Sequence, residues 1–501
     1  MSTTIIIPSP SKYRVAIFDW IKNGNGNAVI EAVAGSGKST TIIDALDIIP
    51  KEKTKGFLAF NKAIVEELKL KISLENTDVK TLHSAGFSAL IFTYKSKLDT
   101  YKYRKFLNDS LYLLSSQITI DSSNEEQNSF KSRVLNLLDL ARVELVSSIN
   151  EIEGIALKHE IGIEEDEAEV VLKLMKWGIN NPRTVDFTDM IYIPVVKKLH
   201  IKQYDWVLVD ECQDLSSAQR ELFQMMINPK GGRFIAVGDA CQSINGFAGA
   251  DNESFAKIRS IENTISLPLS ICYRCDSNIV NIAKRLVPQI EARENAGEGI
   301  VKTLDKISLS DFKPGDMILS RVTAPLVKMC MHLITNGISS YVKGKELGTS
   351  LINLVKRTKT NDIMNMFELL ANELYKIQVK ISKRNGISLE ESKDDYAYIA
   401  LQDKIECLHN ISFGCLNTIE LIEKIGNLFK DTDKGICCST IHKSKGLSSE
   451  RVFVIALDKF PLKRCMNVDW KAKQETNLQY VCYTRAKHEL YFVNCDIKEI
   501  K

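Results

Sequence analysis

Residues 32–40 read AVAGSGKST, a glycine-rich stretch between two segments of different character. The apolar run AVIEAV at residues 28–33 leads into it with the composition of a short buried strand, and TTIIDAL at residues 40–46 continues as a helix. Glycines between a strand and a helix let backbone N–H groups surround phosphate oxygens, and the start of the helix adds positive potential. The stretch therefore predicts a phosphate-binding loop in an α/β domain. The alternative is a glycine turn with a purely structural role.

Two side chains of this loop have defined chemical roles in a P-loop. The amine of Lys38 reaches the β- and γ-phosphates, and the hydroxyl of Ser39 is a ligand for Mg²⁺. Ala32 stands where the general pattern has its first glycine, but the rest of the loop is in register. We expect ATP and Mg²⁺ as cofactors. The nucleotide-binding residues predicted in the loop are Ala34, Gly35, Ser36, Gly37, Lys38, Ser39 and Thr40.

An acidic motif follows a second apolar strand. Residues 206–209 read WVLV and lead directly into DECQD at residues 210–214. Ligands bind at the carboxyl ends of the strands in open parallel sheets. Asp210 is therefore predicted to hold Mg²⁺ through water, and Glu211 to orient or deprotonate the water that attacks phosphorus. A solvated acidic turn is the alternative, and the nearby phosphate-binding loop favours the catalytic interpretation.

Short apolar strands alternate with helices along the chain, which is typical of parallel α/β sheets. Besides those already named, strands are predicted at residues 56–60, 234–237, 452–455 and 490–493. In one long region the apolar residues instead recur at three- and four-residue steps, which predicts helices. These residues are Phe130, Val134, Leu137 or Leu138, Ala141 and Leu145. The sequence thus predicts parallel sheets interrupted by helical insertions.

Composition places the chain among globular proteins with sizeable cores. Of its 501 residues, 44% are hydrophobic and 26% are charged, and the net charge of +3 neither requires nor excludes a polyanionic partner. The sequence lacks a signal peptide or an apolar run of about 18 residues, so we expect a cytoplasmic or DNA-associated protein without membrane contact. Twelve cysteines follow no regular spacing, and Cys272 and Cys275 lack the second pair that a zinc site needs.

Six further motifs occur in a fixed order along the chain. They are LAFNKA at 58–63, TLHS at 81–84, VGDACQSI at 237–244, LSICYR at 269–274, STIHKSKGL at 439–447 and YVCYTRAK at 480–487. Together with the loop at 32–40 and the acidic box at 210–214, they resemble the motifs of superfamily 1 helicases of the UvrD/Rep type. This resemblance spans most of the chain. It implies an α/β fold of two RecA-like P-loop NTPase domains with parallel sheets, each interrupted by a mainly helical insertion.

The resemblance assigns further catalytic roles. It implies that Gln242 links the γ-phosphate to the nucleic-acid site, that Tyr273 stacks on adenine, and that Arg274 contacts the γ-phosphate. Arg485 is implied as the second arginine finger. Physical chemistry agrees, because two arginines from outside the P-loop domain neutralise transition-state charge only when two domains close over ATP. With Glu211, these residues form the predicted catalytic set.

The same resemblance implies contacts with a nucleic-acid strand. Aromatic side chains give stacking that tolerates any base, which suits a motor that steps along a strand. Phe60 and Phe247 are the predicted stacking platforms, and Asn61, His83 and His442 are the predicted polar contacts.

Several positions differ from the family pattern. The adenine-reading glutamine should fall near Tyr13 or Arg14, and Ser448 stands where the family has the glutamate of KGLE. Both differences concern nucleotide discrimination. Asn245 and Ala248 replace residues that follow the third motif in the family, so part of the DNA contact is altered.

These observations lead to four expected segments. A first RecA-like ATP-binding domain comprises residues 1–92 and 185–265, and a helical insertion comprises residues 93–184. The second RecA-like domain comprises residues 266–350 and 432–501, and a smaller helical insertion comprises residues 351–431.

We expect an ATP-dependent DNA helicase that translocates on single-stranded DNA in the 3′ to 5′ direction, the polarity being implied by the resemblance. Two alternatives are a single-strand translocase that removes bound proteins with little unwinding, and a nucleic-acid binding protein that does not hydrolyse ATP. The expected partners are single-stranded DNA, single/double-strand junctions and a loading or replication/repair protein, with the chain itself monomeric.

Overall fold

The computed structural model describes residues 11–59, 62–71, 75–116, 118–119, 121–159, 161–163, 166–244, 253–429, 435–462, 466, 469–497 and 500. The chain forms two compact units, Met1–Ser270 and Ile271–Lys501. Each unit contains a six-stranded sheet in which every strand pairing is parallel. The predicted fold class, α/β with two RecA-like domains, is confirmed.

The sheet of the first unit contains the strand that precedes the glycine-rich loop. In spatial order its strands are β3 (Thr77–Lys80), β2 (Lys55–Leu58), β6 (Trp206–Val209), β7 (Arg233–Gly238), β1 (Asn27–Ala32) and β8 (Thr264–Leu269). Each central strand has near-continuous apolar sequence because both faces of the sheet are covered. The expected domain boundary at 265/266 falls within β8, which pairs along its length with β1.

Helices cover the two faces of this sheet. On one face Ile17, Ile42 and Val65 pack against the strands. The helices that carry them are α1 (Lys12–Asn23), α2 (Lys38–Ile48) and α3 (Lys62–Lys71). On the other face Leu82 and Phe223 lie in a second core. That core is covered by α4 (Leu82–Tyr94), α9 (Asp189–Val196), α10 (Ser217–Met225) and α11 (Ser254–Arg259).

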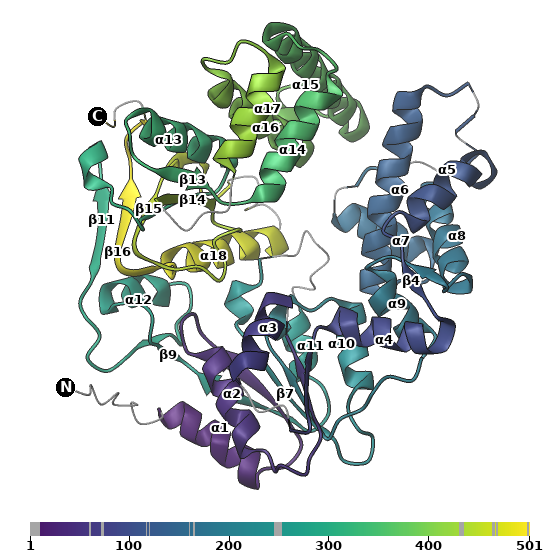
Figure 1. Ribbon diagram of the computed structural model, residues 1–501, viewed down its shortest axis with the longest axis vertical. Coiled ribbons are helices and arrows are strands. Elements are labelled where there is room, and N and C mark those ends of the chain that lie inside the picture. The colour runs from purple at the N-terminus through teal and green to yellow at the C-terminus, as the bar shows by residue number, and fades with distance from the viewer. Residues whose placement is uncertain are drawn as a thin grey trace. The chain divides into compact units, whose positions relative to one another are not determined.

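The expected first insertion is helical and has a core of its own (Figure 1). Its elements are β4 (Lys97–Leu98), α5 (Lys102–Leu114), α6 (Asn124–Glu144), α7 (Ile149–Lys158), α8 (Glu167–Asn180) and β5 (Thr184–Val185). The predicted periodic residues Phe130, Val134 and Ala141 are buried in this core. Leu145 lies just beyond α6 with a φ of +61° and ends the helix.

The second unit repeats the same design. Its strands, in spatial order, are β11 (Ile300–Leu304), β16 (Ala486–Val493), β15 (Ser449–Val454), β12 (Met317–Ser320), β14 (Ile436–Thr440) and β13 (Ser340–Val342). A small parallel ladder joins β9 (Ile271–Cys272) to β10 (Glu291–Ala292). The accompanying helices are α12 (Ser277–Lys284), α13 (Thr323–Thr335) and α18 (Asp469–Tyr483).

The expected second insertion is helical, its expected start at residue 351 falls within the first of its described helices, and these helices share one core with this sheet. They are α14 (Lys345–Arg357), α15 (Ile363–Asn385), α16 (Tyr396–Ser412) and α17 (Thr418–Leu428). Leu351, Met366, Leu408 and Leu421 are buried together in it. Across the described part of the chain, no helix is both long and apolar enough to span a bilayer.

Candidate nucleotide site and strand contacts

The glycine-rich loop joins β1 to the first turn of α2. Gly35 and Gly37 have φ angles of +68° and +80°. A Cβ atom added to Gly37 would meet no described atom within 4 Å, so the left-handed backbone, and not lack of space, requires glycine here. Ala34 and Ser36 are buried, whereas Ser39 and Thr40 are exposed on the first turn of α2. The loop therefore presents the start of a helix at the carboxyl end of a central strand.

A chain of polar contacts connects the three predicted catalytic motifs of the first unit. Lys38 Nζ lies 3.2 Å from Glu211 Oε1, and Gln213 Nε2 donates to Glu211 Oε2 at 2.5 Å. The backbone N–H of Asp239 donates to Gln213 Oε1 at 3.0 Å, and Gln242 Nε2 donates to Asp239 Oδ2 at 2.6 Å. Lys38, Glu211 and Gln242 were predicted from the sequence and are brought into one network. Gln213 and Asp239 lie within the sequence motifs, but no catalytic role was predicted for either residue. They link Glu211 to Gln242.

The acidic residues follow β6 in a tight turn. The N–H of Asp210 donates to the carbonyl of Leu58 at 3.1 Å, which fixes Asp210 at the end of the sheet. The N–H of Glu211 donates to Asp210 Oδ1 at 2.9 Å. Glu211 itself has a φ of +51°, a conformation that costs a non-glycine residue about 1 kcal/mol. This turn directs the carboxylates of two consecutive residues to the same end of the sheet.

Burial and neighbouring charges raise the pKa values of three groups in this cluster, Lys38, Asp210 and Asp239. Burial disfavours the ammonium form of Lys38, but the charges of Glu211, Asp239 and Asp210 outweigh it and raise the pKa of Lys38. Burial, reinforced by repulsion from Glu211, raises the pKa of Asp210 to about 6. The pKa of Asp239 is also raised, mainly by burial. One buried cation is therefore surrounded by three carboxylates.

The residues of the loop fit a magnesium nucleotide. The hydroxyl of Ser36 is buried and has no hydrogen-bond partner among the described residues, so a polar group remains to be satisfied inside the loop. Ser39 and Asp210 would supply oxygen ligands, which Mg²⁺ prefers. Lys38 would supply a positive charge for phosphate oxygens.

The second unit brings together the two predicted arginine fingers. Arg274 donates from NH1 to the carbonyl of Thr484 at 3.2 Å. Arg485 is buried, and its guanidinium donates to the carbonyls of Val481 at 2.8 Å and Leu447 at 2.9 Å. Burial, followed by the nearby charge of Arg274, lowers the pKa of Arg485 to about 10. The close approach of two cations shows that this region accumulates positive charge.

Tyr273 and the positions of Tyr13 and Arg14 in α1 are those that the sequence relates to adenine recognition. Tyr273 is 38% exposed, and its carbonyl accepts a hydrogen bond from Arg293 NH1 at 2.6 Å. Its ring is therefore accessible for stacking. In the first unit, Arg14 pairs with Asp44, which ties α1 to α2.

Two of the residues predicted to contact a nucleic-acid strand, His83 and His442, lie in described parts of the chain. His83 is in the first turn of α4, where burial lowers its pKa. His442 follows β14, and burial together with the charge of Arg321 lowers its pKa to about 3. Both imidazoles are thus neutral hydrogen-bonding groups at neutral pH. The remaining predictions, Phe60, Asn61 and Phe247, lie outside the described residues.

Two family models match the chain. One describes the UvrD/REP helicase N-terminal domain and covers residues 16–261, and the other describes the UvrD-like helicase C-terminal domain and covers residues 349–496. The chain therefore belongs to the UvrD/Rep-type superfamily 1 helicases.

Individual relatives carry related names. The chain is 24% identical over 499 residues to F-box DNA helicase protein 1 of Schizosaccharomyces pombe, covering 92% of this chain and 55% of that protein. It is 26% identical over 433 residues to the probable DNA helicase II homolog of Mycoplasma genitalium, covering 74% and 58%. It is 22% identical over 437 residues to ATP-dependent DNA helicase PcrA of Staphylococcus aureus, covering 63% and 59%. The chain thus spans somewhat more than half the length of these relatives.

Proposed function

We propose that the chain is an ATP-dependent DNA helicase that translocates on single-stranded DNA in the 3′ to 5′ direction. The observation that carries this proposal is the contact chain from Lys38 through Glu211, Gln213 and Asp239 to Gln242. It connects a phosphate-binding amine to a general base and a polar sensor, which are the parts that phosphoryl transfer needs. Membership of the UvrD/Rep-type helicases supports DNA as the nucleic acid along which the protein moves.

The residues of the first unit have separate tasks in this proposal. Lys38 holds phosphate charge, and the carboxylate of Glu211 takes a proton from the attacking water. Both oxygens of Glu211 are engaged, one by Lys38 and one by Gln213. An anion that draws Lys38 away frees Oε1, so occupation of the loop and release of the base are coupled. Ser39 and Asp210 would hold Mg²⁺, which would supply positive charge next to the phosphate oxygens.

The second unit supplies Arg274 and Arg485 to the same reaction, and Tyr273 stacks on the adenine. Phe60, Asn61, His83, Phe247 and His442 contact the strand. We also propose the four-part organisation of residues 1–92 with 185–265, 93–184, 266–350 with 432–501, and 351–431. Single-stranded DNA and its junctions with duplex are the substrates, and a loading or replication/repair protein is a candidate partner.

Hydrolysis and strand displacement by variant proteins test this function. Lys38→Ala removes the phosphate charge and Glu211→Gln removes the base, so each should lower DNA-stimulated ATP hydrolysis about 100-fold or more while single strands still bind. The matched control is Glu221→Gln on the exposed face of α10, which should hydrolyse ATP like the unmodified protein. Near-normal turnover by Glu211→Gln would assign the base elsewhere.

Substrates with different tails separate the remaining alternatives. Unwinding of a 3′-tailed duplex, but not of 5′-tailed or RNA substrates, is the expected result. Displacement of a bound protein without unwinding would instead identify a translocase. Binding of single strands without any ATP hydrolysis would identify a non-hydrolysing binding protein.

A further inference from the structure

A cavity of about 590 Å³ opens in the helical insertion of the first unit, among elements that are not part of the nucleotide site. It lies between the end of α4, the start of α5 and the end of α8. Its volume is in the range of pockets that hold small organic ligands. The lining combines aromatic rings, amides and charges of both signs, which is unusual for a simple packing defect.

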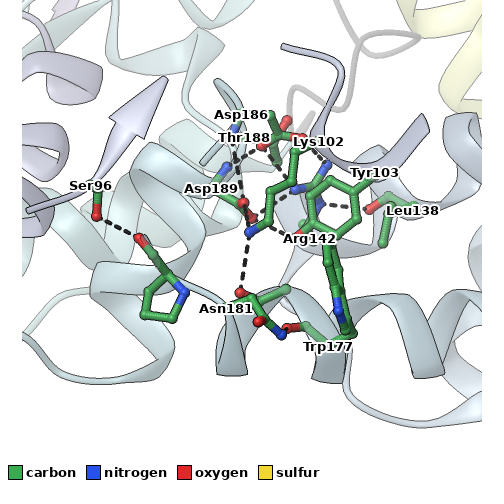
Figure 2. A network of polar contacts seen from close by, with 12 residues as sticks. Ser96, Lys102, Tyr103, Leu138, Arg142, Trp177, Asn181, Asp186, Thr188 and Asp189 are labelled. Atoms are coloured by element: carbon green, nitrogen blue, oxygen red, sulfur yellow. Dashed lines mark hydrogen bonds and ion pairs between the residues drawn. The ribbon is translucent and has the colours of Figure 1, made fainter. Parts of the chain in front are cut away.

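One residue of the lining, Lys102, belongs to a buried polar network (Figure 2). Lys102 lines the cavity, yet its side chain is only 1% exposed, because Nζ donates to Asp189 Oδ2 at 2.7 Å and to the carbonyl of Gly178 at 3.2 Å. Tyr103 and Arg142 both donate to the other oxygen of Asp189, at 2.7 and 2.8 Å. These contacts therefore fix the position of Lys102 in the cavity lining before any ligand binds.

One wall of the cavity is aromatic. The rings of Phe106 and Trp177 stack with centroids 3.8 Å apart and an interplanar angle of 9°. Trp177 is held in place by the edge of Tyr103 and by Lys102, whose Nζ lies 5.5 Å from its ring centroid. Both stacked rings line the cavity and are only partly buried. A flat ligand can extend this stack, and stacking on aromatic side chains is independent of base identity.

The rim offers polar groups that can recognise the edge of a ring. Among the described residues, neither the amide of Asn180 nor the guanidinium of Arg183 has a hydrogen-bond partner, and both side chains are exposed. Asn181 Nδ2 donates to the carbonyl of Trp177 at 2.9 Å. Lys105 is paired with Asp99 at 2.7 Å. Two exposed donor groups therefore border an aromatic wall.

The charges of the lining nearly cancel. Lys102 is neutralised by Asp189 and Lys105 by Asp99, so Arg183 and Asp109 remain as single opposite charges. Such a balance does not suit a polyphosphate. It suits a flat, neutral heterocycle with hydrogen-bonding edges, with Arg183 placed for one adjoining phosphate.

We propose that this cavity binds one unpaired base of a nucleic-acid strand, stacked on the Phe106–Trp177 pair and hydrogen-bonded by Asn180 and Arg183. The proposal rests on the proposed function, because a base at this position belongs to the strand on which the protein acts. A base bound in this cavity gives the helical insertion a contact with the nucleic-acid strand that is separate from the nucleotide site.

Fluorescence anisotropy with a labelled 20-nucleotide single strand tests the site in the whole 501-residue chain. Asn180→Ala and Arg183→Ala should each weaken binding about fivefold, and Phe106→Ala about tenfold or more. The matched controls are Asn108→Ala and Arg104→Ala, exposed residues of α5 outside the cavity lining, which should bind like the unmodified protein. Because Phe106 also packs against the core of the insertion, the two exposed rim variants decide the result if Phe106→Ala does not fold.

Photo-cross-linking locates the base independently of affinity. A strand carrying 5-iododeoxyuridine should cross-link to peptides containing Phe106 or Trp177, and the cross-link should be lost when Asn180 and Arg183 are both alanine. Cross-links confined to other peptides, or rim variants that bind like the controls, would overturn the proposal.

The two proposals fail in different ways. If single strands do not stimulate ATP hydrolysis by the unmodified protein, the proposed function is wrong. If they do stimulate it and the cavity variants bind normally, only the base site is wrong.

Discussion

Glu211 shows how a single residue can be both strained and functional. Its left-handed backbone is unfavourable for a side chain with a Cβ atom, yet the hydrogen bond from its N–H to Asp210 and the ion pair with Lys38 hold it there. The same conformation places its carboxylate between an amine and the amide of Gln213. The unfavourable backbone conformation of Glu211 therefore accompanies the position of its carboxylate, which is the proposed base.

His442 gives a prediction on pH. The folded state holds its pKa at about 3, below the ordinary value of 6.5, so the unfolded chain binds a proton more readily. Stability from this residue is therefore intact above pH 6.5 and decreases as the pH falls toward 3. Between pH 7.5 and pH 5 the loss should reach about 2 kcal/mol. Urea unfolding measures this loss as the difference in the free energy of unfolding between the two pH values. The difference should be smaller for His442→Asn than for the unmodified protein.

The exposed His200 provides the control for that measurement. For His200→Asn, the free energy of unfolding should change between pH 7.5 and pH 5 as much as it does for the unmodified protein. If His442→Asn keeps it as well, the imidazole of His442 titrates in the folded state much as it does in the unfolded chain. The neutral hydrogen-bonding role proposed for it with the strand would then need revision.

Among the elements, the helices of the first insertion are joined by buried charge. Asp189 at the start of α9 accepts hydrogen bonds from Lys102 and Tyr103 on α5 and from Arg142 on α6 (Figure 2). Arg142 also contacts Asp186 at 2.8 Å. Lys102, Arg142 and Asp189 are each no more than 1% exposed in their side chains, so this network has little access to water.

Removal of the central carboxylate should therefore destabilise the protein. Asp189→Asn leaves two buried cations with the partly exposed carboxylate of Asp186, and we expect a loss of about 3–5 kcal/mol in the free energy of unfolding. Asp139→Asn is the matched control, because Asp139 contacts the same Arg142 but is 59% exposed, and it should cost less than about 1 kcal/mol. Equal effects of the two substitutions in urea unfolding would show that the network contributes no more than a surface ion pair.

The strands that could be predicted from sequence are mostly those buried on both faces. β1, β6 and β7 occupy central places in the first sheet, and their apolar runs mark them within a residue or two. β3 and β8 are the edges of that sheet, and their sequences, TDVK and TISLPL, are partly polar and partly exposed. Edge strands need less apolar surface, so composition alone does not reveal them. β12 has four buried residues, as β6 has, but no catalytic motif directly follows it to mark it as a strand.

Site residues were predictable where a motif fixes both type and spacing. Lys38, Glu211 and Gln242 belong to such motifs and meet in one network. The bridging roles of Gln213 and Asp239 depend on distances between loops that no sequence pattern records. The inward orientation of the Arg485 guanidinium, toward carbonyls of its own unit, is likewise a property of the fold.

At the scale of the whole molecule, the proposed catalytic residues are divided between two units. The phosphate-binding loop and the carboxylates belong to Met1–Ser270, and the two arginines belong to Ile271–Lys501. A unit that carries only half of the charge stabilisation should bind nucleotide and hydrolyse it slowly. This division is what would make hydrolysis depend on the state of both units, and so allow it to be coupled to movement.

Arg274 is the better of the two arginines with which to test this dependence. Arg485 donates to backbone carbonyls from a fully buried position, so its removal would also destabilise the second unit, whereas Arg274 makes one such contact at 3.2 Å. Arg274→Ala should lower kcat for DNA-stimulated hydrolysis about 1000-fold, the scale of an arginine finger, with nucleotide affinity changed far less. Arg285→Ala, an exposed neighbour after α12, should leave kcat unchanged. If Arg274→Ala hydrolyses ATP at the rate of this control, Arg274 is not an arginine finger, and any dependence of hydrolysis on the second unit must come from other residues such as Arg485.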